Sequence, residues 1–398
     1  MITDKKKTSV LSKHSCSLCD NNDAAIFFEI HEMPTQDGIF SSSKEEALNT
    51  VKGDIILSYC ENCGYICNEG HVDEKIRFDT YDFSLSKSPS FRKYVDEATD
   101  KLIAKYDLHG KNILDVGCGE GYFLREICRK GNNQGIGIDP GFNHQSLERR
   151  QKGSVNFLRE YYSRDHAHLQ VDFLICRLVI DLLNDPFGFL KTVRENLENQ
   201  RDCIVYFEVP NTDFNLDELC IWNLVYEHKS WYTPETLSYF FELCGFETLD
   251  IYPCWKNEFL AIEARPKDVI EKPVPTLRQA LQQKTERLKN ALAEIKLEST
   301  KKLQYLQSSN RSVVAWGAGA RAVSFFNLFE EADYISHIVD INAKRQGKYL
   351  PGTGQLVIKP EELPELAPDC VLITNPTYAE EIKGQVRELG LEPEFWVL

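Results

Sequence analysis

Apolar and polar positions alternate regularly through the middle of the chain. Apolar runs typical of buried strands lie at 112–116, 134–138, 173–176, 203–208, 247–252 and 259–264, and amphipathic stretches separate most of them. Strands that alternate with helices form a mostly parallel sheet with helices on both faces. Residues 76–268 are therefore predicted to form a doubly wound α/β domain.

The pattern changes on both sides of this block. Residues 1–75 contain two cysteine pairs and little helical periodicity. After a proline-rich break, residues 276–307 contain no Gly or Pro and carry leucines near helical spacing, which predicts one long amphipathic helix. We interpret this helix as an inter-domain brace or a dimer contact. Apolar runs at 312–316, 335–339 and 369–374 predict a second Rossmann-like unit, so that residues 269–398 form a linker helix and a C-terminal α/β domain.

Charge narrows the possible partners. The 398 residues include 61 acidic and 46 basic side chains, a formal charge of −15, which disfavours nucleic acid and anionic membranes. Apolar runs fall short of the roughly 20 residues that span a bilayer, and the N-terminus lacks the apolar core of a signal peptide. Thirteen cysteines without such a signal fit a reducing compartment. We expect a cytoplasmic monomer or homodimer that binds a small molecule, with neither nucleic acid nor a membrane as partner.

The most informative motif follows the first predicted strand of the middle block. Asp115, Gly117, Cys118 and Gly119 lie in the run Asp-Val-Gly-Cys-Gly-Glu-Gly, and Asp139 follows the next strand. Glycine lets the backbone turn sharply and approach a ligand, and the helix after the loop directs its amide groups at that ligand. An acid about twenty residues further on can bind a ribose diol.

Two cofactors fit a loop of this kind, NAD(P) and S-adenosylmethionine. A dinucleotide site usually has the spacing G-x-G-x-x-G, because the pyrophosphate sits on the helix N-terminus. Here Asp115 precedes the first glycine. A carboxylate there would repel a pyrophosphate but suits the ammonium and sulfonium groups of S-adenosylmethionine. The loop resembles the first motif of the class I S-adenosylmethionine-dependent methyltransferases, and Asp115, Gly117, Cys118, Gly119 and Asp139 are the predicted cofactor-binding residues.

The N-terminal block carries a metal-ligand pattern. Cys16 and Cys19 form one C-x-x-C pair, and Cys60 and Cys63 form another. Two such pairs supply four thiolates for a tetrahedral zinc ion and leave no open position for water. We predict a structural zinc site in a zinc-binding domain. Unpaired buried cysteines or a redox pair are the alternatives.

A cluster of reactive side chains lies at 226–232, soon after the strand at 203–208. Tyr226, Glu227 and His228 are adjacent in this cluster. Methyl transfer needs a nucleophile that is usually freed by removal of a proton, and histidine can remove one near neutral pH. His228 is the candidate base, Glu227 or Glu208 the candidate carboxylate to orient it, and Tyr226 a candidate donor to the developing enolate.

The order of these motifs resembles the deoxysugar C-methyltransferases, bacterial enzymes that methylate nucleotide-linked keto-sugars. The two Cys-x-x-Cys pairs, Asp-Val-Gly-Cys-Gly-Glu-Gly, Glu-x-Pro, Glu-His-x-Ser, Gly-Ala-Gly-Ala at 317–320 and the segment 346–353 carry the resemblance. It implies a zinc-binding N-terminal domain, a class I S-adenosylmethionine domain with its Rossmann-like sheet, and a C-terminal domain that helps to enclose the nucleotide-sugar. It also implies His228 as the base, with Glu227 beside it.

Three functions follow from these patterns. The first is C-methylation of a keto-sugar through an enolate. The second is O-methylation of another small metabolite, which needs a base at most. The third is an NAD-dependent oxidoreductase that uses the C-terminal loop at 317–322, where G-x-G-x-x-A precedes Asp340 by the spacing of a dinucleotide site.

Overall fold

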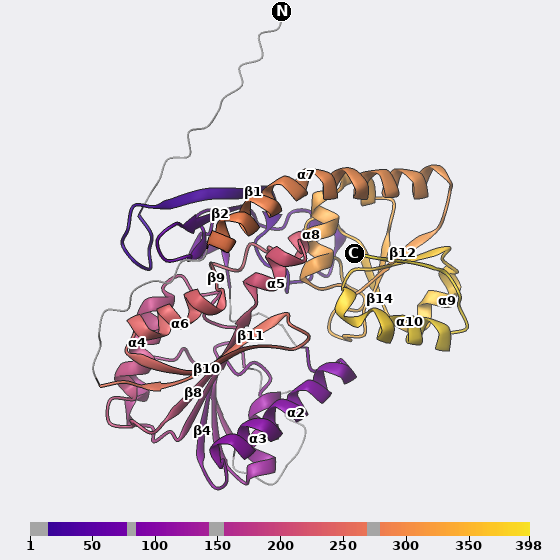
Figure 1. Cartoon of the computed structure of the whole chain (residues 1–398). Coiled ribbons are helices and arrows are strands. Elements are labelled where there is room, and N and C mark those ends of the chain that lie inside the picture. The colour runs from indigo at the N-terminus through magenta and orange to yellow at the C-terminus, as the bar shows by residue number, and fades with distance from the viewer. Residues whose placement is uncertain (1–14, 78–84, 143–154, 269–278) are drawn as a thin grey trace, which may run out of the picture.

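The structure is a computed structural model that describes residues 15–77, 85–142, 155–268 and 279–398. Three sheets follow one another along the chain (Figure 1). The prolines of the predicted linker at 273 and 275, and the start of the predicted long helix, lie outside the described residues.

The central sheet has seven strands in the order β10-β11-β8-β7-β4-β5-β6. Neighbours from β8 to β6 are parallel, and β11 is antiparallel to both β8 and β10. The strands are β4 (Asn112–Val116), β5 (Gln134–Ile138), β6 (Val155–Leu158), β7 (Phe173–Arg177), β8 (Ile204–Pro210), β10 (Phe246–Cys254) and β11 (Phe259–Pro266). This confirms the predicted Rossmann-like α/β fold. In such sheets ligands bind at the carboxyl ends of the strands.

Helices cover this sheet. They are α2 (Pro89–Tyr106), α3 (Tyr122–Gly131), α4 (Pro186–Asn196) and α6 (Pro234–Leu243). The short helix α5 (Thr212–Asp217) packs instead on the long helix α7 (Gln279–Ser308). The α2 helix begins where Ser88 caps the amide of Phe91 and Pro89 occupies the first turn, a combination that favours helix initiation. It packs on α3.

The N-terminal sheet is antiparallel and has the order β1-β2-β3-β9. Its first three strands are β1 (Ala24–Pro34), β2 (Lys52–Cys60) and β3 (Ile66–Asn68), and α1 (Lys44–Leu48) lies between β1 and β2. The fourth strand, β9 (Ser230–Trp231), comes from the middle of the chain. The segment that follows His228 is therefore part of the N-terminal sheet, which the sequence pattern did not predict.

The C-terminal sheet is parallel and has the order β14-β13-β12-β15-β16. Its elements are β12 (Val313–Trp316), α8 (Ala320–Leu328), β13 (His337–Val339), β14 (Leu356–Ile358), α9 (Leu363–Leu366), β15 (Cys370–Ile373), α10 (Ala379–Glu388) and β16 (Glu394–Val397). The predicted second Rossmann-like unit is present.

The long helix α7 (Gln279–Ser308) runs along one side of the molecule between the N-terminal and C-terminal sheets (Figure 1). It contacts β1, α5 and the short helix at 330–332. Its buried Leu281, Leu288 and Leu303 belong to a hydrophobic cluster shared with β1 and α8. This arrangement agrees with the brace interpretation. Within the described residues, the helices are too short or too polar to cross a membrane.

Candidate active site and cysteine cluster

The glycine loop follows β4 at the carboxyl edge of the central sheet. Gly117, Gly119 and Gly121 have positive φ angles of 71°, 53° and 73°. An added Cβ at Gly117 would lie 2.3 Å from a methyl carbon of Val179, whereas one at Gly119 meets nothing within 4 Å. Gly117 is thus required by close packing, and Gly119 borders open space that a ligand can fill.

Asp139 fixes this loop from the end of β5. Its Oδ2 accepts a hydrogen bond from the Gly119 amide at 2.8 Å, and its Oδ1 accepts one from the Gly141 amide at 2.7 Å. Each carboxylate oxygen keeps a further lone pair for a ligand hydroxyl. The α3 helix begins at Gly121 without a side-chain cap, so its first amide groups can face a ligand. The residues present therefore fit S-adenosylmethionine.

Asp115 and Cys118 lie closer to the protein interior than the open side of the loop. Asp115 is 3% exposed. Burial raises the pKa of its carboxyl to about 7, although the Arg177 guanidinium opposes the shift. Cys118 packs against the backbone of Gly137, where an added Cβ would lie 2.7 Å from the thiol sulfur, and burial raises the pKa of that thiol above its usual range.

Glu208 is held in a buried network at the end of β8. Its Oε2 accepts a hydrogen bond from Nε of Arg177 at 2.8 Å. Its Oε1 accepts hydrogen bonds from the hydroxyls of Tyr94 at 2.6 Å and Tyr206 at 2.5 Å. Both oxygens are engaged away from His228, so Glu208 is not the carboxylate that orients the histidine.

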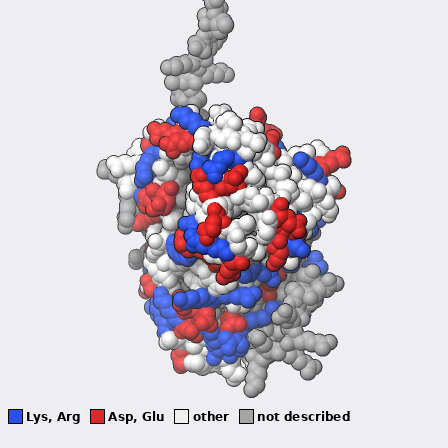
Figure 2. Space-filling view, turned by 90° about the vertical axis from the view of Figure 1, so that its right-hand side faces the viewer, with Lys and Arg blue, Asp and Glu red and all other residues white. Residues whose placement is uncertain are grey.

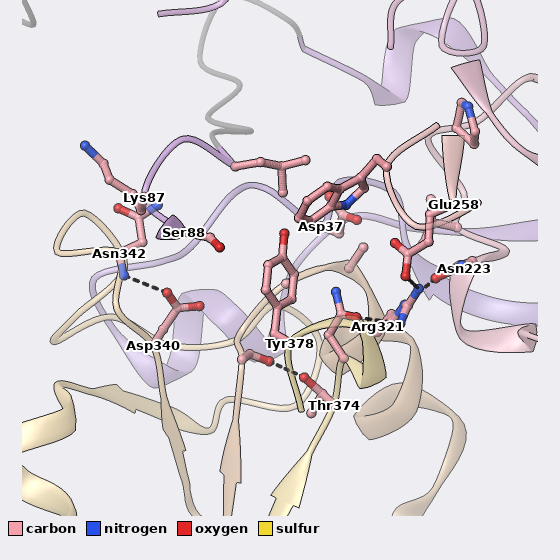
Figure 3. Close-up of a pocket in the computed structure, with 18 of the residues that line it drawn as sticks. Asp37, Lys87, Ser88, Asn223, Glu258, Arg321, Asp340, Asn342, Thr374 and Tyr378 are labelled. Carbon is pink, nitrogen blue, oxygen red and sulfur yellow. Dashed lines mark hydrogen bonds and ion pairs between the residues drawn. The ribbon is translucent and has the colours of Figure 1, made fainter. Parts of the chain in front are cut away.

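A cavity of about 260 Å³ lies between the central and C-terminal sheets (Figure 3). Its central-domain wall is formed by loops that follow β7 and β8, and the N-terminal block contributes Asp37. Val179, which touches Gly117, lies between the lining residues Leu178 and Asp181. The side chain of Val179 therefore lies between the glycine loop and the segment that lines the cavity.

His228 lines this cavity together with Asp181. Its Nε2 lies 3.5 Å from Oδ2 of Asp181, and the two side chains are 19% and 1% exposed. Burial, and secondarily the neighbouring His71, lower the pKa of His228 to about 4. The imidazole is therefore uncharged at neutral pH and can accept a proton.

The structure places Tyr226 outside the cavity. Its hydroxyl donates a hydrogen bond to the Gly70 carbonyl at 3.0 Å and accepts one from the Val72 amide at 2.9 Å. Its ring stacks on His71 with centroids 5.6 Å apart. Tyr226 thus anchors the loop after β3, and this position differs from the expected role as a donor to an enolate. The chain turns at Tyr226 and Glu227, so these two side chains face the N-terminal block and not the cavity.

Glu227 also differs from its expected position. It is buried, and its Oε1 accepts a hydrogen bond from the Asp37 amide at 2.6 Å. The carboxylate beside His228 is that of Asp181, which the sequence interpretation missed. Its position just beyond β7, at the carboxyl edge of the sheet, is the signal that could have indicated it.

The N-terminal sheet fixes the position of His228. Strand β9 pairs with β3, with Trp231 opposite Ile66. The Lys229 carbonyl accepts a hydrogen bond from the Asn68 amide at 2.9 Å, and the Lys229 amide donates to the Asp181 carbonyl at 2.7 Å. The histidine is consequently held between two sheets.

Arg321 joins the C-terminal domain to the central domain beside the cavity (Figure 3). Its guanidinium pairs with Oε1 of Glu258 at 2.8 Å and donates to the side-chain oxygens of Asn223 and Asn375, each at 2.6 Å. The arginine and glutamate side chains are 8% and 11% exposed. A second ion pair joins the same two domains: Lys344 of the C-terminal domain pairs with Glu120 of the glycine loop at 2.8 Å.

Asp340 is the predicted ribose ligand of an NAD site, but its carboxylate accepts hydrogen bonds from groups of its own domain. Its Oδ2 accepts hydrogen bonds from the Ala318 amide at 2.8 Å and from Arg345 at 3.2 Å. Its Oδ1 accepts one from the Asn342 amide at 2.7 Å. These bonds shape the C-terminal loop and occupy most of the capacity that a ribose diol would need.

The four predicted metal ligands converge. The sulfur atoms of Cys16, Cys19, Cys60 and Cys63 all lie within 4.8 Å of one another. The Cys16–Cys63 and Cys19–Cys60 sulfur distances are 3.7 and 3.6 Å, close to the edge of about 3.8 Å expected for a tetrahedron with zinc–sulfur bonds of about 2.3 Å. Gly64, with φ 74°, makes the tight turn after the second pair. The donor set therefore fits a zinc ion.

Positive and negative side chains are interspersed on the face shown in Figure 2. Along α2 and α3, Lys105 pairs with Asp250 and Glu263, and Lys130 pairs with Asp96 and Asp100. These pairs reduce the attraction that Lys105 and Lys130 would otherwise have for a phosphate backbone.

Two family models match the chain. Residues 90–251 match a family described as methyltransferase domain, and residues 278–395 match one described as C-methyltransferase C-terminal domain. Similar solved structures include the magnesium protoporphyrin IX methyltransferase from Synechocystis PCC 6803 with bound S-adenosylhomocysteine, at 17% identity and a TM-score of 0.35, covering 44% of this chain and 84% of that one. Another is a methyltransferase from Archaeoglobus fulgidus, at 18% identity and a TM-score of 0.35, covering 44% and 94%.

Curated relatives match the methyltransferase region only in part. A tRNA U34 carboxymethyltransferase from Dichelobacter nodosus is 26% identical over 164 residues, 36% of this chain and 50% of that protein. The enzyme of the same name from Campylobacter hominis is 29% identical over 121 residues, 29% and 41%. The chain thus spans half the length or less of these relatives.

The fold, the glycine loop and the match over residues 90–251 agree in class: the middle of the chain is similar to S-adenosylmethionine-dependent methyltransferase domains. The match over residues 278–395 narrows the resemblance to C-methyltransferases.

Proposed function

We propose that this protein transfers a methyl group from S-adenosylmethionine to carbon in a small-molecule acceptor, a nucleotide-linked keto-deoxysugar. The observation that carries the proposal is the cavity: it contains an uncharged histidine, it adjoins the glycine loop, and its far wall is the domain that matches C-methyltransferases. A cavity of this size suits a small metabolite better than a polynucleotide.

Asp139 and the Gly119 backbone would hold the ribose and adjoining part of S-adenosylmethionine. Asp115, Gly117 and Cys118 would shape the loop around its amino acid end, with the Asp115 carboxylate favouring the positive charge. When bound, S-adenosylmethionine supplies an electrophilic methyl group. The chain itself needs to orient the acceptor, exclude water and remove one proton.

His228 is the proposed general base. It would take the proton from the carbon next to the acceptor ketone, which leaves an enolate as the nucleophile. Its low pKa keeps the ring uncharged, and its position two residues before β9 would hold it against a bound acceptor. Tyr226 and Glu227 would act indirectly, by holding the segment that carries the histidine.

The cysteine cluster is proposed to bind a structural zinc ion. Four thiolates leave no open coordination position, and the cluster lies beside α6, where the Thr236 hydroxyl donates to the Cys63 carbonyl at 3.4 Å. The ion would stabilise β2 and β3, the strands that position β9.

A second acceptor class is raised by the curated relatives, whose name says that they act on tRNA. The formal charge of −15 disfavours RNA here, and Lys105 of α2 and Lys130 of α3 are paired with acids. O-methylation of a small metabolite would use the same donor loop but would not require enolisation.

Hydrogen exchange tests the proposal. The protein is incubated in heavy water with S-adenosylhomocysteine and a thymidine diphosphate keto-deoxysugar, and deuterium at the carbon next to the ketone is followed by NMR. We expect exchange faster than in the absence of protein. No acceleration, with methyl transfer to a hydroxyl or to tRNA instead, would overturn C-methylation.

A further inference from the structure

Backbone hydrogen bonds also connect Asp181 to the segment that follows His228. The Asp181 carbonyl accepts hydrogen bonds from the amides of both Lys229 and Ser230, at 2.7 and 3.0 Å. The loop after β7 is thereby tied to the two residues that follow the histidine. The 3.5 Å separation of Oδ2 and Nε2 is long, but it can shorten when a ligand fills the cavity.

The remaining polar atoms of the pair have no hydrogen-bond partner within the described parts of the chain. These atoms are Oδ1 of Asp181 and Nδ1 of His228, and both are buried. Buried polar atoms in native proteins are nearly always satisfied. Since both residues line the cavity, a water molecule or a bound acceptor in the cavity can supply the missing partners.

Among the described residues, the ionisable groups that act on Asp181 or His228 are Cys176, Tyr232 and His71. Cys176 on β7 and Tyr232 after β9 are near Asp181, and burial raises the pKa of each well above its usual value, so both stay neutral. His71, after β3, faces His228. Burial raises the pKa of Asp181 itself to about 7.

We infer that Asp181 is the positioning residue of the proposed base: it holds His228 through Nε2 and compensates the charge that the ring acquires. This inference rests on the proposed function, and it assigns the orienting role to Asp181 in place of Glu227 and Glu208.

In the proposed step, His228 takes one proton from the acceptor and later releases it to water. The acceptor C–H bond breaks, its electron pair stays on the acceptor as the enolate, and the proton forms a new N–H bond at Nδ1 of His228. The resulting imidazolium is paired at Nε2 with the Asp181 carboxylate. After methyl transfer the imidazolium releases its proton to water, which restores the neutral ring. An ionised Asp181 favours this step, whereas a protonated one does not.

The test compares Asp181→Asn with the wild-type protein and with Asp213→Asn, which removes an acid paired with Lys284 outside the cavity. We expect Asp181→Asn to lower kcat and the exchange rate about 10²-fold, with KM and S-adenosylhomocysteine affinity changed less than threefold. Wild-type kcat should rise as pH passes about 7, where Asp181 loses its proton, and the variant should lack this rise. Asp181→Glu should recover part of the rate, and Asp213→Asn should match wild type.

Folding provides a separate control. The raised pKa of Asp181 means that the folded state holds its proton up to about pH 7 while the unfolded state loses it near pH 4, so stability falls as pH rises between these values. Asp181→Asn should therefore melt no lower than wild type at pH 8. A variant that folds and exchanges at the wild-type rate would overturn the positioning role alone. Absence of exchange in the wild-type protein would overturn the proposed function as well.

Discussion

At the scale of single residues, the environment of His228 decides what it can do. A histidine on an open surface is half protonated near pH 6.5, whereas burial lowers the pKa of His228 to about 4. The ring is therefore uncharged across the physiological range. Its neighbours in sequence, Tyr226 and Glu227, are bonded to the N-terminal block. Adjacent residues thus have different roles because they face different elements.

Replacing His228 by Gln tests this role. Gln keeps a polar side chain of similar size but cannot accept the proton. We expect turnover to fall by about 10²-fold or more, while affinity for S-adenosylhomocysteine, measured by calorimetry, stays within threefold. The matched control is His168→Gln, on an exposed short helix, which should retain wild-type turnover. Near-normal activity of His228→Gln would remove it as the base.

At the scale of elements, the strand–loop–helix unit around the glycine loop explains the donor site. The apolar run of β4 leads to the buried Asp115. The glycines that follow allow the backbone to pack closely against Val179 before α3 begins. The geometry depends on backbone conformations that other residues adopt at a cost of about 1–2 kcal/mol.

Gly117→Ala should abolish donor binding. The substitution adds left-handed strain and a methyl group 2.3 Å from the Val179 side chain. Gly110→Ala is the matched control, because Gly110 has φ 66° and open space around an added Cβ. Equilibrium dialysis with labelled S-adenosylmethionine should show binding to the Gly110 variant and none to the Gly117 variant. Equal affinities would contradict the assignment of the loop.

The cysteine cluster should be needed for catalysis but not for donor binding. Purified protein should contain one zinc ion per chain by elemental analysis. Cys63→Ser should lose the ion and, because β3 holds β9, most of the methyl transfer activity, while S-adenosylhomocysteine still binds. Cys220→Ser, outside the cluster, is the control. A metal-free protein with full activity would contradict a structural zinc site that positions His228.

The sequence patterns predicted the elements better than the contacts between them. Long apolar runs gave β4, β5 and β12 to within one residue, because buried strands leave that signature. β6 was missed because its side chains are partly exposed, and β14 and β9 because three or two residues carry no periodicity. The four cysteines were found from spacing alone. The pairing of Asp181 with His228 was not, since it depends on two loops meeting in space.

At the scale of the whole molecule, the site is assembled from three sheets. The central sheet supplies the glycine loop and Asp181, and the N-terminal sheet holds β9. The C-terminal domain forms the far wall of the cavity and pairs with the central domain through Arg321 and Lys344. Helix α7 braces the outer two. The acceptor would therefore contact the parts of the chain that differ most from a minimal methyltransferase domain.

Arg321→Ala should loosen this assembly. It leaves the half-buried side chains of Glu258 and two asparagines without their shared partner. Breaking a buried pair in this way costs about 3–5 kcal/mol. We expect lower stability in denaturant and weaker acceptor binding, whereas Arg265→Ala, which removes an exposed pair with Glu247, should cost about 1 kcal/mol or less. Equal losses in the two variants would contradict the bridging role.

The most direct test of the central claim is the bond that the methyl group forms. S-adenosylmethionine labelled with ¹³C in its methyl group is incubated with the protein and a ¹³C-enriched thymidine diphosphate keto-deoxysugar, and the product is examined by NMR. The account predicts one-bond ¹³C–¹³C coupling between the new methyl group and the carbon next to the ketone. A transferred methyl group bonded to oxygen, or donor that remains unbound and unconsumed, would contradict it.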